Sequence, residues 1–255
     1  MNKIKFLGTA GARFVVMKQL RASGGIWLTL DDTNIMIDPG PGSLVRCLSS
    51  RPKLNPMDLD GIILTHRHID HSNDVNIIME AMTNGGLKKR GTVFAPKDAF
   101  EEDPVVLKYA RNYVERLEII REKGIYQIGN VSFTPVKSVH GVETYGLNIK
   151  GKSKSISLIT DTKYFDGLES YYNGDILIIN VVLLEEKPEI DHLSIIDAEK
   201  ILSINKPKLA ILTHFGMRVL KAKPWEIAEN LTKKLGVKVI AARDGMELDI
   251  DQYKK

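Results

Sequence analysis

The segment Ile62–His71 carries the residues best suited to chemistry. An apolar stretch leads into three histidines and an aspartate, in the order His66-Arg-His68-Ile-Asp70-His71. His66 and His68 lie two positions apart, and in extended backbone such side chains point to the same side, so both imidazoles can bind one cation. Asp70 and His71 follow where we expect the chain to turn into a helix, so they can face a second cation. Nitrogen and carboxylate ligands favour zinc, manganese or iron over calcium.

The alternative interpretation of this segment is a histidine-rich surface turn. The chain has only 6 histidines among its 255 residues, so chance rarely produces this order. A motif match still carries a false-positive risk. The other histidines therefore decide how far the metal-binding interpretation extends.

Three further candidate ligands stand at the ends of apolar runs. His140, Asp161 and His214 each come just after a run that we expect to be a strand. Alone, each would more often be a capping residue or a residue at the edge of the core. Beside the first cluster they favour ligation, because a buried sheet presents a binding site where its strands end.

The rest of the chain alternates short apolar runs with turn signals. Predicted strands cover residues 4–7, 26–30, 34–37, 61–64, 92–95, 131–136, 145–149, 155–159, 176–180, 209–212, 237–241 and 247–250. Predicted helices cover residues 72–82, 105–119, 195–203 and 224–235. Pro224 and Gly236 are typical of a helix start and of the position just past a helix end. This mixture predicts two sheets with helices packed outside them.

Composition and charge restrict the classes of protein. Of 255 residues, 43% are apolar and 27% charged. This composition favours a single soluble globular domain that comprises residues 1–255. The net charge of +4 permits an anionic substrate and does not demand nucleic acid. The one cysteine, Cys47, excludes an internal disulfide and a cysteine-cluster zinc site. No run spans a bilayer and no signal peptide is visible, so we expect a cytoplasmic protein without a membrane partner.

Together, these motifs resemble the metallo-β-lactamase superfamily along nearly the whole chain. Leu7-Gly-Thr-Ala-Gly-Ala12 looks like its first strand and loop, and Asp38-Pro-Gly-Pro-Gly42 resembles its Asp-x-Gly motif. The His66-to-His71 cluster is its signature, and Ala242-Arg-Asp-Gly245 resembles a common closing turn. The resemblance implies an α/β (α+β) fold, a four-layer αβ/βα sandwich, with a two-metal site at one edge of the two sheets.

The resemblance also implies a role for each candidate. The first divalent ion takes His66, His68 and His140, and the second takes Asp70, His71 and His214. Asp161 supplies a bridging carboxylate. Asp38 orients a ligand histidine, although it is equally well explained as a turn former before Pro39. Zinc is the expected metal, with manganese or iron as alternatives.

His192 narrows the expected reaction. In Asp191-His-Leu-Ser194 it stands before a predicted helix, and alone it would be an ordinary loop histidine. A histidine followed by x-Ser resembles the phosphodiesterase branch, which includes ribonuclease Z and the cyclic-phosphate phosphodiesterases of phosphonate metabolism. There this histidine protonates the leaving oxygen. Ser194 would hydrogen-bond to phosphate, cap the helix, or do both, and with Asp197 it resembles a capping box.

We therefore expect a hydrolase that acts on a small or cyclic phosphodiester. A hydroxide that bridges two metal ions would attack phosphorus, and His192 and Asp70 would be the catalytic residues. Only 21 residues separate His140 from Asp161. Ribonuclease Z usually carries its tRNA-gripping arm there, so RNA stays open as a partner but standard pre-tRNA processing is not expected.

Several alternatives stay open. A lactone or thioester hydrolase of the same fold would use the same metals, and a non-catalytic metal-binding member is the alternative from another class. A di-iron oxygen or nitric-oxide reductase is disfavoured, because it replaces His68 with a carboxylate and adds a flavin domain. A homodimer is open. Tyr145 and the loop 85–90 are candidate substrate contacts. A position in the core is the preferred explanation for Tyr145, and a surface turn is the preferred explanation for the loop.

Overall fold

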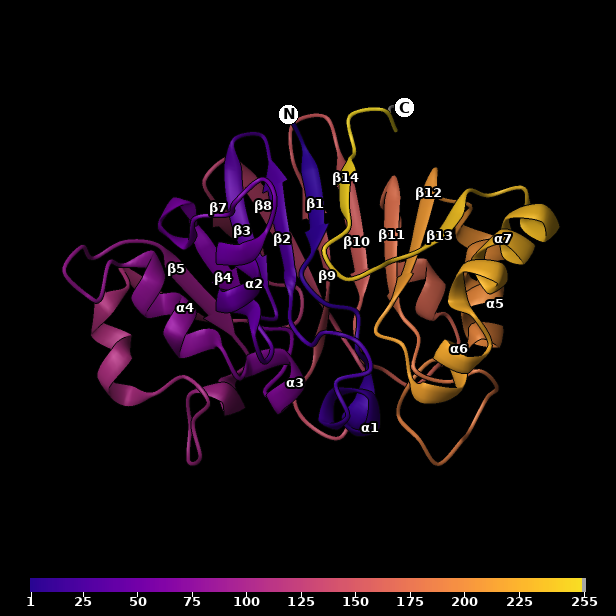
Figure 1. Ribbon diagram of the computed structural model, residues 1–255, viewed down its shortest axis with the longest axis horizontal. Helices are drawn as coiled ribbons and strands as arrows, with labels where there is room; N and C mark the ends of the chain where they lie inside the picture. Colours follow the sequence, from indigo (N-terminus) through magenta and orange to yellow (C-terminus); the bar gives the residue numbers. More distant parts are fainter. Residues whose placement is uncertain (254–255) are drawn as a thin grey trace.

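The computed structural model describes residues 1–253. Two sheets lie face to face in the middle of the molecule, and helices cover the outer face of each (Figure 1). The N-terminus lies at one end of this sandwich, and α1 (Ala12–Met17) and α3 (Ile69–Ser72) lie at the other. The expected four-layer architecture is therefore confirmed.

The first sheet is formed by the N-terminal half of the chain and the last strand. In spatial order its strands are β14 (Glu247–Asp249), β1 (Lys3–Phe6), β2 (Ile26–Leu30), β3 (Thr33–Ile37), β4 (Gly61–Ile63), β5 (Thr92–Ala95) and β6 (Arg116–Ile119). Pairing is antiparallel from β14 to β3 and parallel from β3 to β6. The register places Ile63 of β4 between Ile37 and Phe94. The histidine cluster therefore leaves from an interior strand.

The second sheet mirrors this plan. In spatial order its strands are β13 (Val239–Ala241), β12 (Leu209–Thr213), β11 (Ile176–Asn180), β10 (Ser155–Ile159), β9 (Tyr145–Lys150), β8 (Val131–Lys137) and β7 (Tyr126–Ile128). Pairing is parallel from β10 to β13 and antiparallel from β7 to β10. Parallel strands in both sheets thus end on the same side, where the candidate ligands stand.

The helices pack on the outside because their apolar faces match the outer faces of the sheets. The remaining helices are α2 (Ser43–Ser49), α4 (Val75–Met82), α5 (Ile195–Asn205), α6 (Met217–Lys221) and α7 (Pro224–Leu235). One buried cluster fills the space between the sheets, including Phe6, Phe133 and Leu158. A second lies under α4 and a third under α5 and α7. Burial of these apolar surfaces is the main stabilising contribution.

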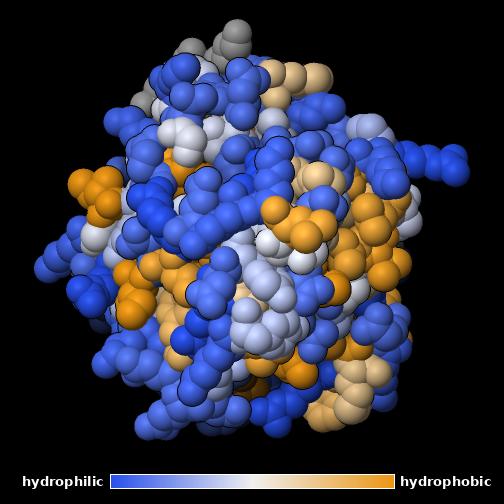
Figure 2. All heavy atoms as spheres, turned by 90° about the vertical axis from the view of Figure 1, so that its left-hand side faces the viewer, coloured by the Kyte–Doolittle hydropathy of each residue, from blue (hydrophilic) through white to orange (hydrophobic). Residues whose placement is uncertain are grey.

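The predicted helix 105–119 is wrong. The structure has a 3₁₀ turn, Lys108–Tyr113, followed by strand β6, which pairs in parallel with β5. Val106, Ala110 and Val114 recur every four residues and are all buried, so the periodicity was real but did not come from an α-helix. Strand pairing at the sheet edge overrode the local pattern. The space-filling view of this side shows mixed hydrophilic and hydrophobic surface (Figure 2).

Other differences are smaller. The predicted helix 72–82 is divided into α3 and α4, and α1, α2, α6 and β7 were not predicted. These elements are short, so their sequence signals are weak. Within residues 1–253, no helix is long and apolar enough to cross a membrane.

Candidate metal centre

The candidate ligands meet because five strands end beside one another. His66 follows β4, His140 follows β8 and Asp161 follows β10. His214 follows β12, and the segment after β11 leads to His192. Every predicted ligand therefore reaches one edge of the sandwich, as expected from strand-end positions.

The first candidate group combines three imidazoles. Ligand atoms of His66, His68 and His140 all lie within 4.8 Å of one another. His68 Nδ1 and His140 Nε2 are 3.1 Å apart. Three imidazole nitrogens in this arrangement would suit an ion of the zinc class, which takes further ligands beside them.

Asp161 stands at the centre of the cluster. Its Oδ2 lies 3.4 Å from His71 Nε2 and 3.3 Å from His214 Nε2. The same oxygen lies 3.9 Å from His66 Nε2 and 3.6 Å from His192 Nδ1. One carboxylate thus faces nitrogens of both predicted ligand sets, which is the position that a bridging ligand needs.

The second candidate group combines Asp70, His71 and His214, whose ligand atoms also lie within 4.8 Å of one another. Asp70 Oδ2 is 3.7 Å from His214 Nε2 and 3.9 Å from His71 Nε2. These distances exceed hydrogen-bond lengths. The carboxylate and imidazoles therefore converge on a common point without bonding one another.

Hydrogen bonds fix the orientation of three imidazoles through their Nδ1 atoms. His71 Nδ1 lies 3.0 Å from Asp38 Oδ2, and His140 Nδ1 lies 2.9 Å from the carbonyl of Asp191. His66 Nδ1 is 3.0 Å from Thr65 Oγ1. Because a carboxylate and a carbonyl only accept, Nδ1 donates in the first two cases and Nε2 is the nitrogen left for metal. Burial lowers the pKa of His71, but the carboxylates of Asp161, Asp70 and Asp38 outweigh it and hold this pKa well above its usual value, so a metal ion must displace a proton from Nε2. The histidine tautomers that metal binding requires are thereby set.

The cluster leaves buried atoms without partners. Among residues 1–253, Nε2 of His66, His71 and His214 and Nδ1 of His192 are buried and make no hydrogen bond. Unpaired buried polar atoms are costly and rare in folded proteins. Four of them at one point, beside two carboxylates, fit divalent cations in the zinc, manganese or iron class.

Burial and mutual proximity shift the pKa values of these groups. Burial, with His71 adding repulsion, holds the pKa of His66 well below its usual value, so its imidazole is neutral. Burial opposes ionisation of Asp161, but His214 and His71 outweigh it and hold the pKa of Asp161 well below its usual value. Neutral imidazole and ionised carboxylate are the forms that bind metal.

Two candidate residues adopt unusual backbone geometry. Asp38 has φ 51° and His214 has φ 59°, a region that residues other than glycine seldom occupy. Glycines let neighbouring backbone approach closely: a Cβ on Gly40 would lie 2.0 Å from the Asp70 carbonyl oxygen, and one on Gly11 would lie 2.0 Å from that of His214. Strained backbone of this kind is concentrated at functional sites.

Asp38 takes the orienting position that the resemblance implies. Besides His71, its carboxylate accepts hydrogen bonds from Thr65 N and Thr65 Oγ1, each at 2.7 Å. Thr65 Oγ1 in turn lies beside His66 Nδ1. One buried carboxylate therefore links the two halves of the histidine cluster.

His192 lies at the cluster and not in solvent. Its side chain is 16% exposed, and Nδ1 forms a further ligand-like group with His140 and Asp161. Burial is the main cause that lowers the pKa of His192, to about 4. Ser194 is fully buried and its Oγ hydrogen-bonds to Asp197 Oδ2 at 2.7 Å, while Asp197 N donates to Ser194 Oγ. The structure therefore gives Ser194 the capping role.

Sequence reasoning missed two positioning residues. Asn180 Nδ2 donates to Asp161 Oδ1 at 2.9 Å, which turns Oδ2 toward the histidines. Thr65 connects Asp38 and His66. Asn180 is the last residue of β11, so the strand-end pattern that identified the ligands would have found it, had amides been included.

The two open substrate contacts lie elsewhere. Tyr145 is 5% exposed and its hydroxyl donates to Glu143 Oε1 at 2.8 Å, so it belongs to the core. In the loop 85–90, Arg90 donates to the carbonyls of Met57 and Leu59. Because these residues precede β4, the loop lies at the opposite end of that strand from His66.

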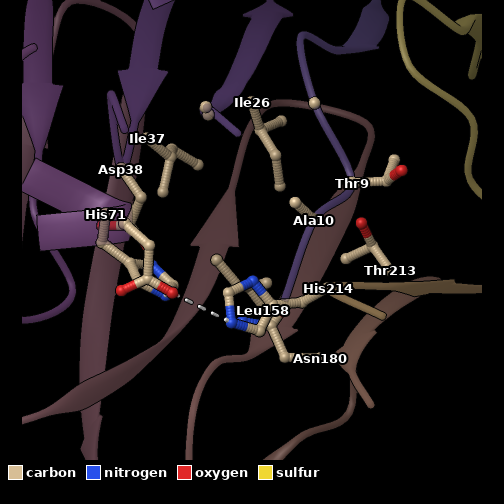
Figure 3. A pocket seen from close by; sticks show the side chains of 14 residues that line it. Thr9, Ala10, Ile26, Ile37, Asp38, His71, Leu158, Asn180, Thr213 and His214 are labelled. Carbon is tan, nitrogen blue, oxygen red and sulfur yellow. Dashed lines mark hydrogen bonds and ion pairs between the residues drawn. The ribbon is translucent and has the colours of Figure 1, made fainter. Parts of the chain in front are cut away.

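A small cavity of about 40 Å³ lies behind the second candidate group. Figure 3 shows Asp38 and His71 on one side of it and His214 on the other. Ile26, Ile37 and Leu158 form its inner wall, and Thr9, Asn180 and Thr213 add polar atoms. The second candidate group is thus backed by an apolar wall from both sheets.

Comparison with known proteins agrees with this architecture. Residues 33–215 match the β-lactamase superfamily domain, and the chain belongs to this superfamily. Metallo-β-lactamase fold protein YhfI from Bacillus subtilis superposes with a TM-score of 0.80 at 20% identity, covering 97% of this chain and 98% of that one. A diphosphatase of the PhnP family superposes with a TM-score of 0.71 at 21% identity, covering 98% of each chain.

Two proteins related by sequence differ in the fraction of their length that matches this chain. Protein MJ1374 from Methanocaldococcus jannaschii is 29% identical over 257 residues, which is 97% of this chain and 95% of its own length. Ribonuclease Z from Kineococcus radiotolerans is 31% identical over 114 residues, which is 45% of this chain and 35% of its own length. The ribonuclease Z match therefore spans less than half of this chain and about a third of that enzyme, whereas MJ1374 matches along nearly its whole length.

Proposed function

We propose that the protein is a dinuclear metal-dependent phosphodiesterase that hydrolyses a small or cyclic phosphodiester. His66, His68 and His140 would hold one divalent ion. Asp70, His71 and His214 would hold the other, with Asp161 between them. Zinc is the expected metal, and manganese or iron fits the same donors.

The observation that carries this proposal is the position of His192. Its Nδ1 lies 3.6 Å from Asp161 Oδ2, and its ring centroid lies 5.1 Å from that of His140. Its side chain is partly exposed, so an imidazole stands at the mouth of the cluster in addition to the seven candidate ligands. A phosphodiester with an alkoxide leaving group needs such a proton donor, whereas a thioester does not.

Bound divalent ions would lower the pKa of water and neutralise charge on the phosphoryl oxygens. His192 would give its proton to the leaving oxygen, worth about 10²- to 10⁴-fold in rate. An imidazole with a pKa of about 4 is neutral at pH 7. Acid catalysis therefore requires the negative charge of the bound substrate to raise this pKa, as a nearby opposite charge does.

The chain supports a small substrate in preference to a large RNA. Between His140 and Asp161 the structure has only strands β9 and β10 with their connections, so no arm is present in this interval. The named relatives and neighbours include ribonuclease Z and a diphosphatase, both of which act on phosphorus–oxygen bonds. RNA stays a secondary candidate substrate. A cytoplasmic location and a homodimer stay predictions.

A lactone or thioester hydrolase is the second candidate function, because it would use the same donors. A thiolate leaves without a proton, so His192 favours a phosphodiester over a thioester. A lactone also expels an alkoxide, so direct hydrolysis assays separate it from a phosphodiester. A non-catalytic metal-binding protein is the third candidate.

Hydrolysis of bis(p-nitrophenyl) phosphate tests the proposal. Protein loaded in turn with zinc and manganese should release nitrophenolate, and Asp161→Ala loaded identically should not. Cyclic nucleotides, cyclic sugar phosphates and short RNA would follow. If protein shown to hold two ions is inactive on this compound but cleaves lactones or thioesters, the phosphodiesterase proposal is wrong.

A further inference from the structure

A strongly acidic loop borders the candidate metal centre. Residues 185–191 contain four acidic residues and one lysine, in a chain whose net charge is +4. Glu185, Glu186 and Glu189 are exposed. Figure 1 shows this loop extending beyond the ends of β11 and β12, on the side of α1 and α3. The charge of this loop is therefore opposite to that of the molecule as a whole.

Backbone hydrogen bonds hold this acidic loop against the cluster. The carbonyl of Asp191 accepts from His140 Nδ1 at 2.9 Å, and His192 N donates to the carbonyl of Ile190 at 2.8 Å. Lys163 donates through Nζ to the carbonyl of Pro188. Even with the charges of Lys163 and Lys187 included, the acidic residues outnumber the basic ones. The negative field therefore lies beside His140 and His192.

On the side of His214, the candidate metal centre is bordered by α1. There α1 is fixed to the segment after His214, because Gly11 N donates to the carbonyl of Phe215 at 3.1 Å. Arg13 is exposed and Phe14 is 59% exposed. The helix beside the His214 segment thus carries an exposed basic and an exposed aromatic residue, whereas the loop before His192 is acidic.

The acidic loop also lies beside the buried, unpartnered nitrogens of the candidate metal centre. Nε2 of His66 and of His214 are buried without partners, in side chains that are 0% and 9% exposed. Nδ1 of His192 is likewise unpartnered. The acidic loop therefore borders a site that has its own polar atoms to satisfy.

We propose that the acidic loop selects phosphodiesters whose leaving alcohol carries a positive charge, such as an aminoalcohol, and disfavours polyanions. This rests on the proposed function, because His192 protonates the leaving oxygen and so places the leaving group beside the loop. Water forms the new oxygen–phosphorus bond, the bond from phosphorus to the alcohol oxygen breaks, and that oxygen takes its proton from His192. The products are a phosphomonoester and the cationic alcohol.

The size of the effect follows from screening. Exposed charges act over about 8 Å at physiological salt, and further at low salt. Charges at the mouth of a site change substrate capture by about tenfold or more. We expect kcat/KM for a cationic leaving group to exceed that for an anionic one about tenfold at low ionic strength, and the ratio to shrink as salt is added.

Three aryl methyl phosphodiesters test this selection. Their leaving phenols carry a trimethylammonio, a nitro or a sulfonate group. The nitro compound is uncharged on its leaving group and reports the phosphodiesterase activity without any effect of leaving-group charge. The variant Glu185→Lys/Glu186→Lys/Glu189→Lys should reverse the preference between the cationic and anionic compounds. The matched control, Glu226→Lys/Glu229→Lys on α7, changes exposed acids on the outer helix and should leave the preference unchanged.

Equilibrium binding gives a readout independent of turnover. Metal-loaded protein should bind choline phosphate more tightly than the phosphate ester of isethionic acid, and the triple variant should not. A triple variant Glu185→Gln/Glu186→Gln/Glu189→Gln should abolish the preference without reversing it. Metal content and circular dichroism confirm that each variant is folded.

The outcomes separate the two proposals. If the nitro compound is hydrolysed but the cationic and anionic compounds react alike, the loop does not select charge and only this inference is overturned. The same holds if the control changes the preference as much as the loop variant does. If none of the three compounds is hydrolysed by protein that holds two ions, the proposed function fails and this inference fails with it.

Discussion

At the residue scale, the site depends on which nitrogen each imidazole offers. Asp38, Thr65 and the carbonyl of Asp191 occupy the Nδ1 atoms of His71, His66 and His140, and this leaves Nε2 toward the centre. The strand-end pattern predicted the positions of the candidate ligands. The resemblance to the superfamily named Asp38 as an orienting residue. Thr65 and the carbonyl of Asp191 were not predicted, because a threonine hydroxyl and a backbone carbonyl have no sequence signature of their own.

Asn180→Ala tests the support of the central carboxylate. Without the amide, Asp161 Oδ1 loses its donor and the carboxylate is free to turn, so we expect metal affinity to fall about 10- to 100-fold, as for other residues that orient ligands. Competition with a chromophoric chelator measures this affinity. Asn148→Ala is the matched control, since Asn148 contacts Ser157 and the carbonyl of Tyr171. Equal affinity in Asn180→Ala and the native protein would contradict this role.

At the element scale, the position of the candidate site depends on parallel strands that end beside one another. It depends little on where each helix begins and ends. All twelve predicted strands correspond to strands in the structure, because alternating apolar and turn signals are strong in buried sheets. The segment 105–119 was misassigned because residues at helical spacing are buried there by a 3₁₀ turn. Only tertiary pairing with β5 shows that Arg116–Ile119 is a strand.

Ser194→Ala should destabilise the protein by about 1 kcal/mol, the usual effect of removing a helix cap. The capping box of α5 is buried, and Ser194 Oγ and N both bond to Asp197 Oδ2. Urea denaturation of the metal-free protein measures the change. Ser203→Ala in the same helix is the control, because Ser203 Oγ bonds only to the carbonyl of Lys200 within its own helix. A loss of bound metal without loss of stability would instead give Ser194 a role at the site.

At the scale of the whole molecule, the two sheets come together around unpaired buried atoms. Apolar packing between the sheets positions those atoms but does not satisfy them. A bound cation would therefore stabilise the folded chain relative to the unfolded one. The resemblance predicted both the layers and the common edge, whereas composition and periodicity alone predicted only two sheets covered by helices.

Zinc or manganese should raise the Tm of chelator-treated protein. A ligand at 100 times its Kd adds about 2.7 kcal/mol, which corresponds to a rise of about 5 °C or more for a chain of this size. Differential scanning calorimetry with and without metal measures the shift, and Asp161→Ala should reduce it. An unchanged Tm in native protein would indicate that the cluster holds no ion.

We propose that the protein is a metal-dependent phosphodiesterase in which His192 protonates the leaving group. The most direct measurement compares His192→Ala with native protein for bound metal and for hydrolysis of phosphodiesters with nitrophenolate and alkoxide leaving groups. We predict two bound ions in both proteins. His192→Ala should hydrolyse the substrate with an alkoxide leaving group about 100-fold more slowly or worse, and the substrate with a nitrophenolate leaving group should be slowed much less. Loss of metal from His192→Ala, or an equal loss with both leaving groups, would contradict the claim.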